Sequence, residues 1–296
     1  MRKNKEICIV SPIYPPDIGG PATYVFDLAQ RLKKDYKINI VAFCESKPAL
    51  IKNTDIYAIN PKKYGFLGRQ LRLFAKLWKV AAKAETLYIQ GPIVVGMTSL
   101  IFAKIKGIKS IMKFVGDIAW EEASRNGKTE LDLESWLQSK HRDFRSALIK
   151  RIQKITLNSA AKLVVPSQFL KNILVKYYDV DASKIELIYN AFEGEGKRKQ
   201  HADRGYKIIT AGRLVPHKKV DLIVEAVARL PEKYTLDIYG SGPEKNNIQR
   251  KIEELNVGDR IKMRGSLSKM ELLKVMNQKD IFVLYSSYEG LPHVVL

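Results

Sequence analysis

Cysteine is scarce in this chain of 296 residues, which contains only Cys8 and Cys44. Both lie in apolar segments that predict strands, and two buried thiols do not make the disulfide framework of a small secreted scaffold. A signal peptide is not indicated either, because the apolar run 7–10 after the charged N-terminus is too short for its core. These shortages predict a protein of a reducing, cytoplasmic compartment.

Long uncharged runs are scarce as well. Residues 86–103 carry no charge over 18 positions, which is the lower limit for a membrane-spanning helix. The run contains Gly91-Pro92, a pair that typically ends one element and begins another. The pattern therefore favours a buried strand over 87–90, followed by a core helix with Pro92 in its first turn, over a transmembrane span.

Acidic residues are few relative to basic ones. The chain has 31 Asp and Glu against 51 Lys and Arg, a formal net charge of +20. Folding does not require such an excess, because like charges repel in a compact state. The imbalance predicts an acidic partner: a nucleic acid, an anionic lipid or a phosphorylated small molecule. No known nucleic-acid-binding motif is present, so a specific nucleic-acid partner is not expected.

Strand and helix patterns alternate along the chain, which predicts an α/β protein with parallel sheets covered by helices. The predicted strands are 7–10, 38–43, 87–90, 110–115, 208–211, 235–239, 261–264 and 281–285. The alternation stops in a polar stretch that contains almost no apolar residue. We therefore expect one domain over 1–192, a linker over 193–205 and a second domain over 206–296.

Ligands bind outside the carboxyl ends of the strands in such open sheets, so the loops there are the first candidates. Gly19 and Gly20 precede Pro21 at a predicted helix start, where free N–H groups would face an anion. Alone this is a weak signal, because the same residues are common in ordinary turns. The loop is neither a dinucleotide-binding fingerprint nor a P-loop.

Three further loops of this kind occur in the second half. Arg213 and Lys218 lie five residues apart on one loop, where they could converge on a phosphate or could form a solvated basic turn. Gly240 and Gly242 follow the next strand. Glu289 precedes Gly290 after the last strand, where its carboxylate could accept hydrogen bonds from ligand hydroxyls or could cap a helix.

Taken together and in this order, the four loops resemble those of retaining glycosyltransferases of the GT-B fold, family 4. Residues 164–167 and 188–191 also resemble segments of that family, so the resemblance covers nearly the whole chain. It implies two Rossmann-like domains facing each other across a cleft. The C-terminal domain would hold a nucleoside-diphosphate sugar and the N-terminal domain a lipid-linked or glycan acceptor.

The resemblance also implies roles for individual residues. Arg213 and Lys218 would grip the donor diphosphate and stabilise charge on the leaving group, with neither a metal nor a cofactor. Glu289 would bind sugar hydroxyls. The remaining substrate-binding candidates are glycines and backbone groups of the same loops, namely Gly19, Gly20, Gly240, Gly242, Gly290, Leu291, His293 and Val294.

The sequence departs from the family pattern at two places. Many relatives have a histidine near the acceptor, whereas here Asp117 stands in that region; it would line the acceptor side or cap a helix. In the family motif, a second glutamate, which would hold the donor ribose, follows the first after seven residues. Counted from Glu289, that position comes directly after Leu296 and is not part of this sequence. We therefore expect a second domain that is incomplete at its C-terminus, and the activity of such a truncated chain is in doubt.

A basic stripe is predicted on a helix in the first domain. Its residues step by three or four positions, and they are Arg69, Arg72, Lys76, Lys79 and Lys83. Apolar residues with the same steps lie on another face, and they are Leu67, Leu71, Phe74, Trp78 and Ala81. The pattern is typical of a helix at an anionic membrane surface, or of a core helix with a solvated basic face.

Two hypotheses on function follow. The first is a glycosyltransferase of cell-envelope polysaccharide synthesis, located in the cytoplasm and peripherally bound to the inner face of the cell membrane. The second is a noncatalytic basic α/β protein that binds a nucleotide or a polyanion. The sequence identifies neither the base nor the sugar of the donor.

Overall fold

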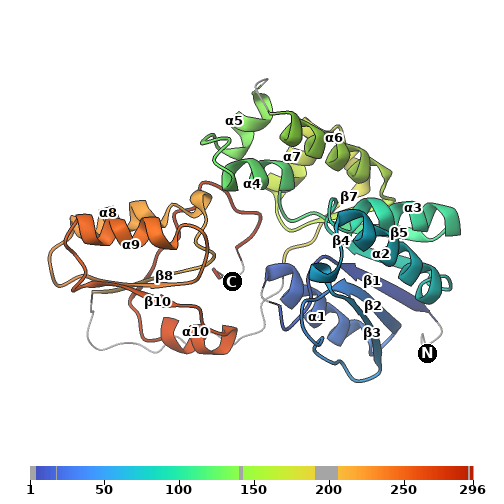
Figure 1. Cartoon of the computed structure of the whole chain (residues 1–296), viewed down its shortest axis with the longest axis horizontal. Helices are drawn as coiled ribbons and strands as arrows, with labels where there is room; N and C mark the ends of the chain where they lie inside the picture. Colours follow the sequence, from blue (N-terminus) through green and yellow to red (C-terminus); the bar gives the residue numbers. More distant parts are fainter. Residues whose placement is uncertain (1–4, 18, 140–142, 191–205, 293, 296) are drawn as a thin grey trace. The chain divides into compact units, whose positions relative to one another are not determined.

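The computed structural model describes residues 5–17, 19–139, 143–190, 206–292 and 294–295. The chain forms two compact units, one made of Met1–Glu121 with Leu137–Asn190 and the other of Glu122–Trp136 with Ala191–Leu296. Each unit has its own parallel sheet (Figure 1). The predicted linker and His293 lie outside the described residues, so the predicted domain boundary stays a prediction.

The first unit is built on a seven-stranded sheet of order β3-β2-β1-β4-β5-β6-β7. Every neighbouring pair in it is parallel. The strands are β1 Glu6–Ser11, β2 Lys37–Phe43, β3 Thr54–Ile59, β4 Thr86–Gln90, β5 Lys109–Lys113, β6 Lys162–Val165 and β7 Ile185–Leu187. Chain order changes direction between the neighbouring strands β1 and β4. In sheets of this kind, ligands bind at the carboxyl ends of the strands at such a switch point.

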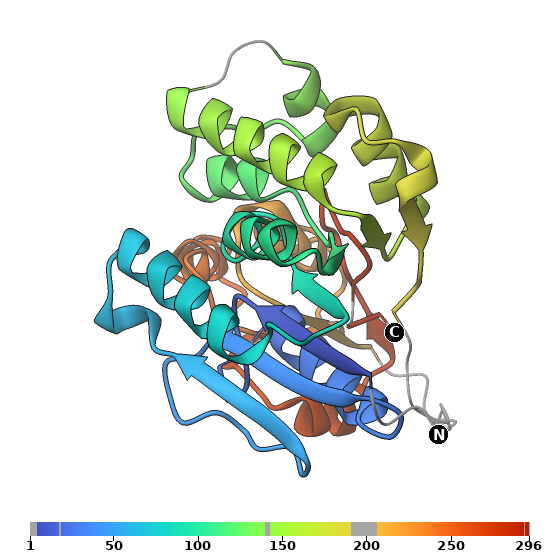
Figure 2. The ribbon, with the colours of Figure 1, turned by 90° about the vertical axis from the view of Figure 1, so that its right-hand side faces the viewer.

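Helices cover both faces of this sheet (Figure 2). Helix α1 packs on one face, and α2 and α3 pack against each other on the opposite face. The helices of this unit are α1 Gly20–Leu32, α2 Phe66–Val80, α3 Gly96–Lys106, α6 Phe144–Ser159 and α7 Gln168–Tyr178, with short 3₁₀ turns η1 Pro61–Lys63 and η2 Ala182–Lys184. Helices α4 Ile118–Arg125 and α5 Leu133–Gln138 lie where the chain passes from the first unit into the second and back. The layers bury near-continuous apolar strands, as expected for a two-sided parallel sheet.

The second unit repeats this plan on a smaller scale. Its sheet has the order β10-β9-β8-β11 and is parallel throughout. Helices α8 and α9 cover one face and α10 lies on the other (Figure 1). The elements are β8 Lys207–Ala211, η3 Pro216–Lys218, α8 Val220–Ala228, β9 Thr235–Tyr239, α9 Lys245–Glu254, β10 Ile261–Gly265, α10 Lys269–Met276 and β11 Ile281–Phe282.

The uncharged stretch 86–103 forms a strand followed by a helix, as predicted. The helix begins at Gly96, however, so placing Pro92 in its first turn was wrong. Gly91 explains the break, because it has a φ of +97° that an L side chain rarely adopts. In the described part of the chain, no helix has both the length and the apolar character needed to cross a membrane.

Both cysteines are free and buried, in agreement with the expectation that they form no disulfide.

Strand β3 was missed by the sequence prediction. It lies at the edge of the sheet, and only Ile59 of its six residues is buried. An edge strand keeps polar residues such as Thr54 and Asp55, so the apolar run that identifies a central strand is missing.

Candidate functional site

The loops at the carboxyl edge of the second sheet are joined by backbone hydrogen bonds. After β8, the N–H of Gly212 donates to the carbonyl of Tyr239 at 2.9 Å. The N–H of Leu214 donates to the carbonyl of Ser241 at 2.9 Å, and the N–H of Glu244 donates to the carbonyl of Leu214 at 3.0 Å. These bonds satisfy backbone groups that would otherwise be unpaired, so the two loops form one rigid platform.

Two of the predicted substrate-binding glycines are required by this platform. A Cβ on Gly240 would lie 1.8 Å from the carbonyl oxygen of Gly212, and its φ is +145°. A Cβ on Gly242 would lie 2.2 Å from the carbonyl oxygen of Leu214. The close approach of the loops therefore accounts for both glycines without a ligand, and their contact with a donor stays a prediction.

Lys218 and Glu289 meet in an ion pair, although 71 positions separate them. Lys218 ends η3 after β8, and Glu289 lies in the segment after β11. Their side chains are only 14% and 23% exposed. The N–H of Ser287 also donates to the carbonyl of His217 at 2.9 Å, so the two segments are fixed to each other next to the pair.

Arg213 and Lys218 line the same small hollow, together with Tyr239 and Leu284. Its volume is about 10 Å³, which is about the room of one water molecule. A nucleotide cannot enter so small a space and would have to lie over the loops. The structure therefore brings together three of the four residues that were predicted to be catalytic: Arg213, Lys218 and Glu289.

His217 was not singled out from the sequence, although it lies directly before Lys218. Burial, followed by the charges of Lys218 and Arg213, lowers its pKa to about 4, while Glu289 acts in the opposite direction. The imidazole is therefore neutral at pH 7. Its ring packs edge-on against buried Tyr288, with centroids 6.5 Å apart. A histidine beside two cations in one loop is the signal that could have identified it.

The segment after Glu289 is described as far as Val295, except for His293. Gly290 and Leu291 are partly buried in an irregular stretch. The N–H of Val295 donates to the carbonyl of Pro292 at 3.1 Å, which closes a turn around Val294. The roles predicted for Gly290, Leu291, His293 and Val294 stay predictions.

The glycine loop of the first unit lies at the start of α1. Gly19 precedes the helix, and its carbonyl accepts from the N–H groups of Ala22 and Thr23 at 3.0 and 3.2 Å. Among the described residues, no side chain caps this end of the helix. Gly19 is extended, with a φ of 172°, so an unusual backbone conformation does not require glycine there. The predicted anion site at Gly19 and Gly20 stays a prediction.

Asp117 is the predicted catalytic residue whose environment argues against that role. Its side chain is fully buried, and it accepts hydrogen bonds from the Trp120 N–H at 3.0 Å and from the Tyr178 hydroxyl. Burial raises the pKa of Asp117, and the Tyr178 bond opposes the rise. The geometry is that of a residue capping α4, so the capping interpretation is favoured over contact with an acceptor.

Lys113, a residue that the sequence prediction passed over, is buried at the carboxyl end of β5. It is 1% exposed, and its Nζ donates to Asn190 Oδ1 at 2.7 Å. The same Nζ lies 3.3 Å from the ring centroid of Tyr24 in α1. Burial lowers its pKa to about 7. The signal in the sequence was a lysine that directly follows the apolar residues Ile111 and Met112 and precedes Phe114.

Comparison with known families agrees with this architecture. Residues 18–193, more than half of the chain, match the Glycosyltransferase Family 4 model. Residues 193–296 match the Glycosyl transferases group 1 model. The chain belongs to glycosyltransferase family 4.

Two curated relatives and one solved structure give the range of similarity. An N-acetylgalactosamine-N,N'-diacetylbacillosaminyl-diphospho-undecaprenol 4-alpha-N-acetylgalactosaminyltransferase of Campylobacter jejuni is 27% identical over 51% of this chain and 42% of its own length. One subunit of human phosphatidylinositol N-acetylglucosaminyltransferase is 22% identical over 97% of this chain. The chain spans 58% of that relative's length, so it covers less than two thirds of either protein.

The solved structure is that of Anabaena HepE in complex with UDP and glucose. It matches with a TM-score of 0.73 and 17% identity, over 98% of this chain and 77% of HepE. The similarity confirms the predicted fold class, α/β with two Rossmann-like domains of the GT-B type. The predicted incompleteness of the second domain stays a prediction.

Replacement of Lys113 by methionine should remove a pH dependence of stability. The pKa of Lys113 falls from 10.5 to about 7 on folding, so the unfolded chain binds more protons between these values. The free energy of unfolding should therefore rise with pH from about 7 to 9 more steeply in the wild type than in Lys113→Met, by up to about 1.4 kcal/mol per pH unit. Urea unfolding at several pH values, followed by tryptophan fluorescence, measures this free energy for both proteins. Exposed Lys109→Met in the same strand is the control, and parallel curves for wild type and Lys113→Met would contradict the assignment.

Alanine at position 240 should destabilise the second unit. The new Cβ would overlap a backbone oxygen, and the loops would have to separate, at a cost of about 2 kcal/mol or more. Gly258→Ala is the control, because its nearest neighbour is an Ile252 methyl 4.0 Å away. It should change the free energy of unfolding by less than about 0.5 kcal/mol. Equal denaturation midpoints for the two variants would show that the loops are not packed as described.

Proposed function

We propose that this chain provides the donor site and the acceptor-side domain of a retaining glycosyltransferase. It would transfer a sugar from a nucleoside diphosphate to a lipid-linked or glycan acceptor of the cell envelope. The observation that carries the proposal is the meeting of Arg213, Lys218 and Glu289 at one edge of the second sheet. Two cations and a carboxylate there suit a ligand that joins a diphosphate to a polyhydroxylated sugar.

The chemistry follows from the charges. When the bond between the sugar and the diphosphate breaks, negative charge grows on the leaving phosphate, and Arg213 and Lys218 would stabilise it. The two side chains supply positive charge at this place, so we propose a reaction that uses neither a metal nor another cofactor. Glu289 would then accept hydrogen bonds from sugar hydroxyls.

The relatives support the choice of donor and acceptor. HepE was solved with UDP and glucose, which makes a uridine diphosphate sugar a reasonable first donor to test. The names of the Campylobacter and human relatives specify a diphospho-undecaprenol and phosphatidylinositol. Both are lipids that carry phosphate, so we propose an acceptor of that class for this chain, with a location at the inner face of the cell membrane.

Neutralising either cation should weaken donor binding and transfer. Lys218→Gln and Arg213→Gln should each lose about 2–4 kcal/mol of transition-state stabilisation, the scale for one preorganised group. A panel of nucleoside-diphosphate sugars is screened by thermal shift and calorimetry, followed by a transfer assay with lipid acceptors. Lys262→Gln is the matched control, because Lys262 is exposed near the amino end of β10, away from this edge.

The results separate the two functional hypotheses. Binding and transfer that are lost in Lys218→Gln but kept in Lys262→Gln support the enzyme. Donor binding without transfer, in a chain that contains every segment of its full-length relatives, favours the noncatalytic nucleotide-binding protein. Normal binding by both loop variants would refute the site.

Helix α2 and its neighbour α3 carry the observations for membrane binding. Leu73 and Leu77 form the buried side of α2. The apolar face predicted from the sequence is a different one, and much of it is exposed to solvent. Leu67 is 75%, Leu71 73% and Trp78 46% exposed. Helix α3 packs against α2 and also exposes two isoleucines, and we define the apolar face as Leu67, Leu71, Trp78, Ile101 and Ile105.

One basic group contacts this apolar face, and others lie on the same helix. Lys106 Nζ lies 3.7 Å from the ring centroid of Trp78, and Arg72 and Lys79 are on the same helix as Leu71. Exposed leucine and tryptophan next to lysine and arginine suit the boundary between anionic headgroups and acyl chains. We propose that this surface attaches the chain peripherally to an anionic membrane.

Serine at Leu67 and Leu71 should reduce binding to anionic vesicles about tenfold or more, since burying each leucine is worth about 1.5–3 kcal/mol. Both side chains are exposed, so the fold should not change. Leu50→Ser is the matched control, because Leu50 is 76% exposed and lies outside the face. Co-sedimentation with phosphatidylglycerol vesicles at rising salt measures binding, which should fall as charges are screened. Equal binding by the double variant and the control would contradict the membrane proposal.

A further inference from the structure

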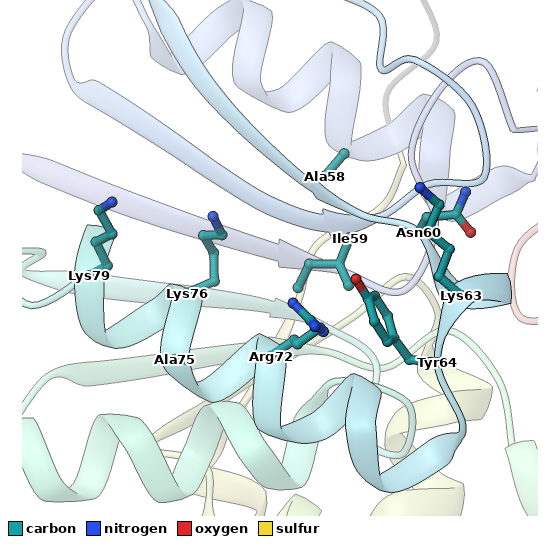
Figure 3. A pocket seen from close by; sticks show the side chains of 9 residues that line it. All are labelled: Ala58, Ile59, Asn60, Lys63, Tyr64, Arg72, Ala75, Lys76 and Lys79. Carbon is teal, nitrogen blue, oxygen red and sulfur yellow. The ribbon is translucent and has the colours of Figure 1, made fainter.

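A second candidate site lies in the first unit, where α2, β3 and η1 border it. A hollow of about 470 Å³ separates α2 from the edge strand β3 and the turn η1 (Figure 3). Small and apolar residues, including Ala58, Ile59 and Ala75, form part of its lining. Its polar lining is Asn60, Lys63, Tyr64, Arg72, Lys76 and Lys79.

The charge of this lining has one sign. Four cations face the hollow, and among the described residues no carboxylate lines it. In the same part of the chain that the structure describes, none of the four forms an ion pair within 4.0 Å. The nearby acid Glu45 pairs with Lys62 at 2.7 Å, outside the hollow. Like charges gathered around one concave space repel each other, and an anion in that space would relieve the repulsion.

Several of these groups are held in place before any ligand arrives. The guanidinium carbon of Arg72 lies 3.9 Å from the centroid of the Tyr64 ring, and Lys76 Nζ lies 5.5 Å from that of Tyr57. Asn60 fixes η1, because its side chain accepts from the Lys62 N–H at 2.9 Å and donates to the Glu45 carbonyl at 2.8 Å. A fixed donor set loses less entropy on binding than a flexible one.

The geometry favours a compact anion over an extended one. Arg72, Lys76 and Lys79 come from successive turns of α2, and Lys63 and Tyr64 come from the segment at η1 (Figure 3). Cations therefore border the hollow from two segments of the chain, whereas a nucleic-acid strand needs charges along one open stripe. Guanidinium and ammonium groups are the usual partners of phosphate oxygens.

We propose that this hollow binds a phosphomonoester or diphosphate group. The group would be presented by a lipid headgroup or by a soluble phosphate compound. The site is distinct from the loops around Lys218, and its occupancy does not depend on the donor proposal. Such a hollow would select a ligand by the charge and the size of its phosphate group, whereas a flat basic surface would select by charge alone.

Calorimetry with inorganic diphosphate tests the site. The titration is done in the Lys218→Gln background, so that the loops of the second unit do not contribute. The double substitution Arg72→Gln/Lys76→Gln should weaken binding at least tenfold. Lys83→Gln/Lys104→Gln removes the same net charge from exposed positions outside the hollow and should change binding less than threefold. If the double variant fails to fold, Lys63→Gln is used in its place, because Lys63 lines the hollow from η1 and not from α2.

Vesicles of equal net charge distinguish the two sources of the phosphate. Vesicles of phosphatidic acid present a monoester, and those of phosphatidylglycerol a diester. Preference for phosphatidic acid that is lost in Arg72→Gln/Lys76→Gln, and competed by diphosphate, supports a lipid headgroup. Diphosphate binding through the hollow without that preference supports a soluble ligand. Absence of diphosphate binding, or equal weakening in the hollow and control variants, overturns the proposal.

Discussion

Parallel strands place all their carboxyl ends at one edge of a sheet, and this constraint determines where both units can carry chemistry. In the second unit it brings the segments after β8, β9 and β11 within hydrogen-bond distance, although they are far apart in sequence. Gly240 allows the first two loops to touch, and the Lys218–Glu289 ion pair joins the third. The candidate site is therefore a product of the topology as much as of any single motif.

The large positive charge is distributed in two ways that have different consequences. Lys218 lies opposite Glu289, so its charge is balanced while no ligand is bound. The cations of the α2 hollow have no such partner in the described structure, and their mutual repulsion is reduced only by solvent and salt. An anion at Lys218 would therefore compete with Glu289, whereas an anion in the hollow would meet no carboxylate among the described residues.

Much of the fold could be predicted because central strands of a parallel sheet are continuous apolar runs. Strand β3 was not predicted, because an edge position permits polar residues. The start of α3 was misplaced, because the conformation of Gly91, and not Pro92, separates the helix from the preceding strand. The loops with Arg213, Lys218 and Glu289 were found from their order along the chain. Lys113 was not, because only the folded structure shows that a tyrosine ring and an asparagine surround its ammonium group.

Helix α2 shows why periodicity alone could not assign its faces. Two apolar sets follow the helical repeat, and the one through Leu73 and Leu77 is buried, while the one through Leu67 and Leu71 is exposed. The packing of α3 decides between them, because Phe102 contacts Phe74 and Trp78 and leaves the remaining apolar side chains uncovered. The same helix thus has a core side, an exposed apolar side and a basic side. If the hollow on the basic side holds a lipid phosphate, that phosphate would lie within one helix diameter of the apolar side, and the two proposed surfaces would then serve one membrane contact.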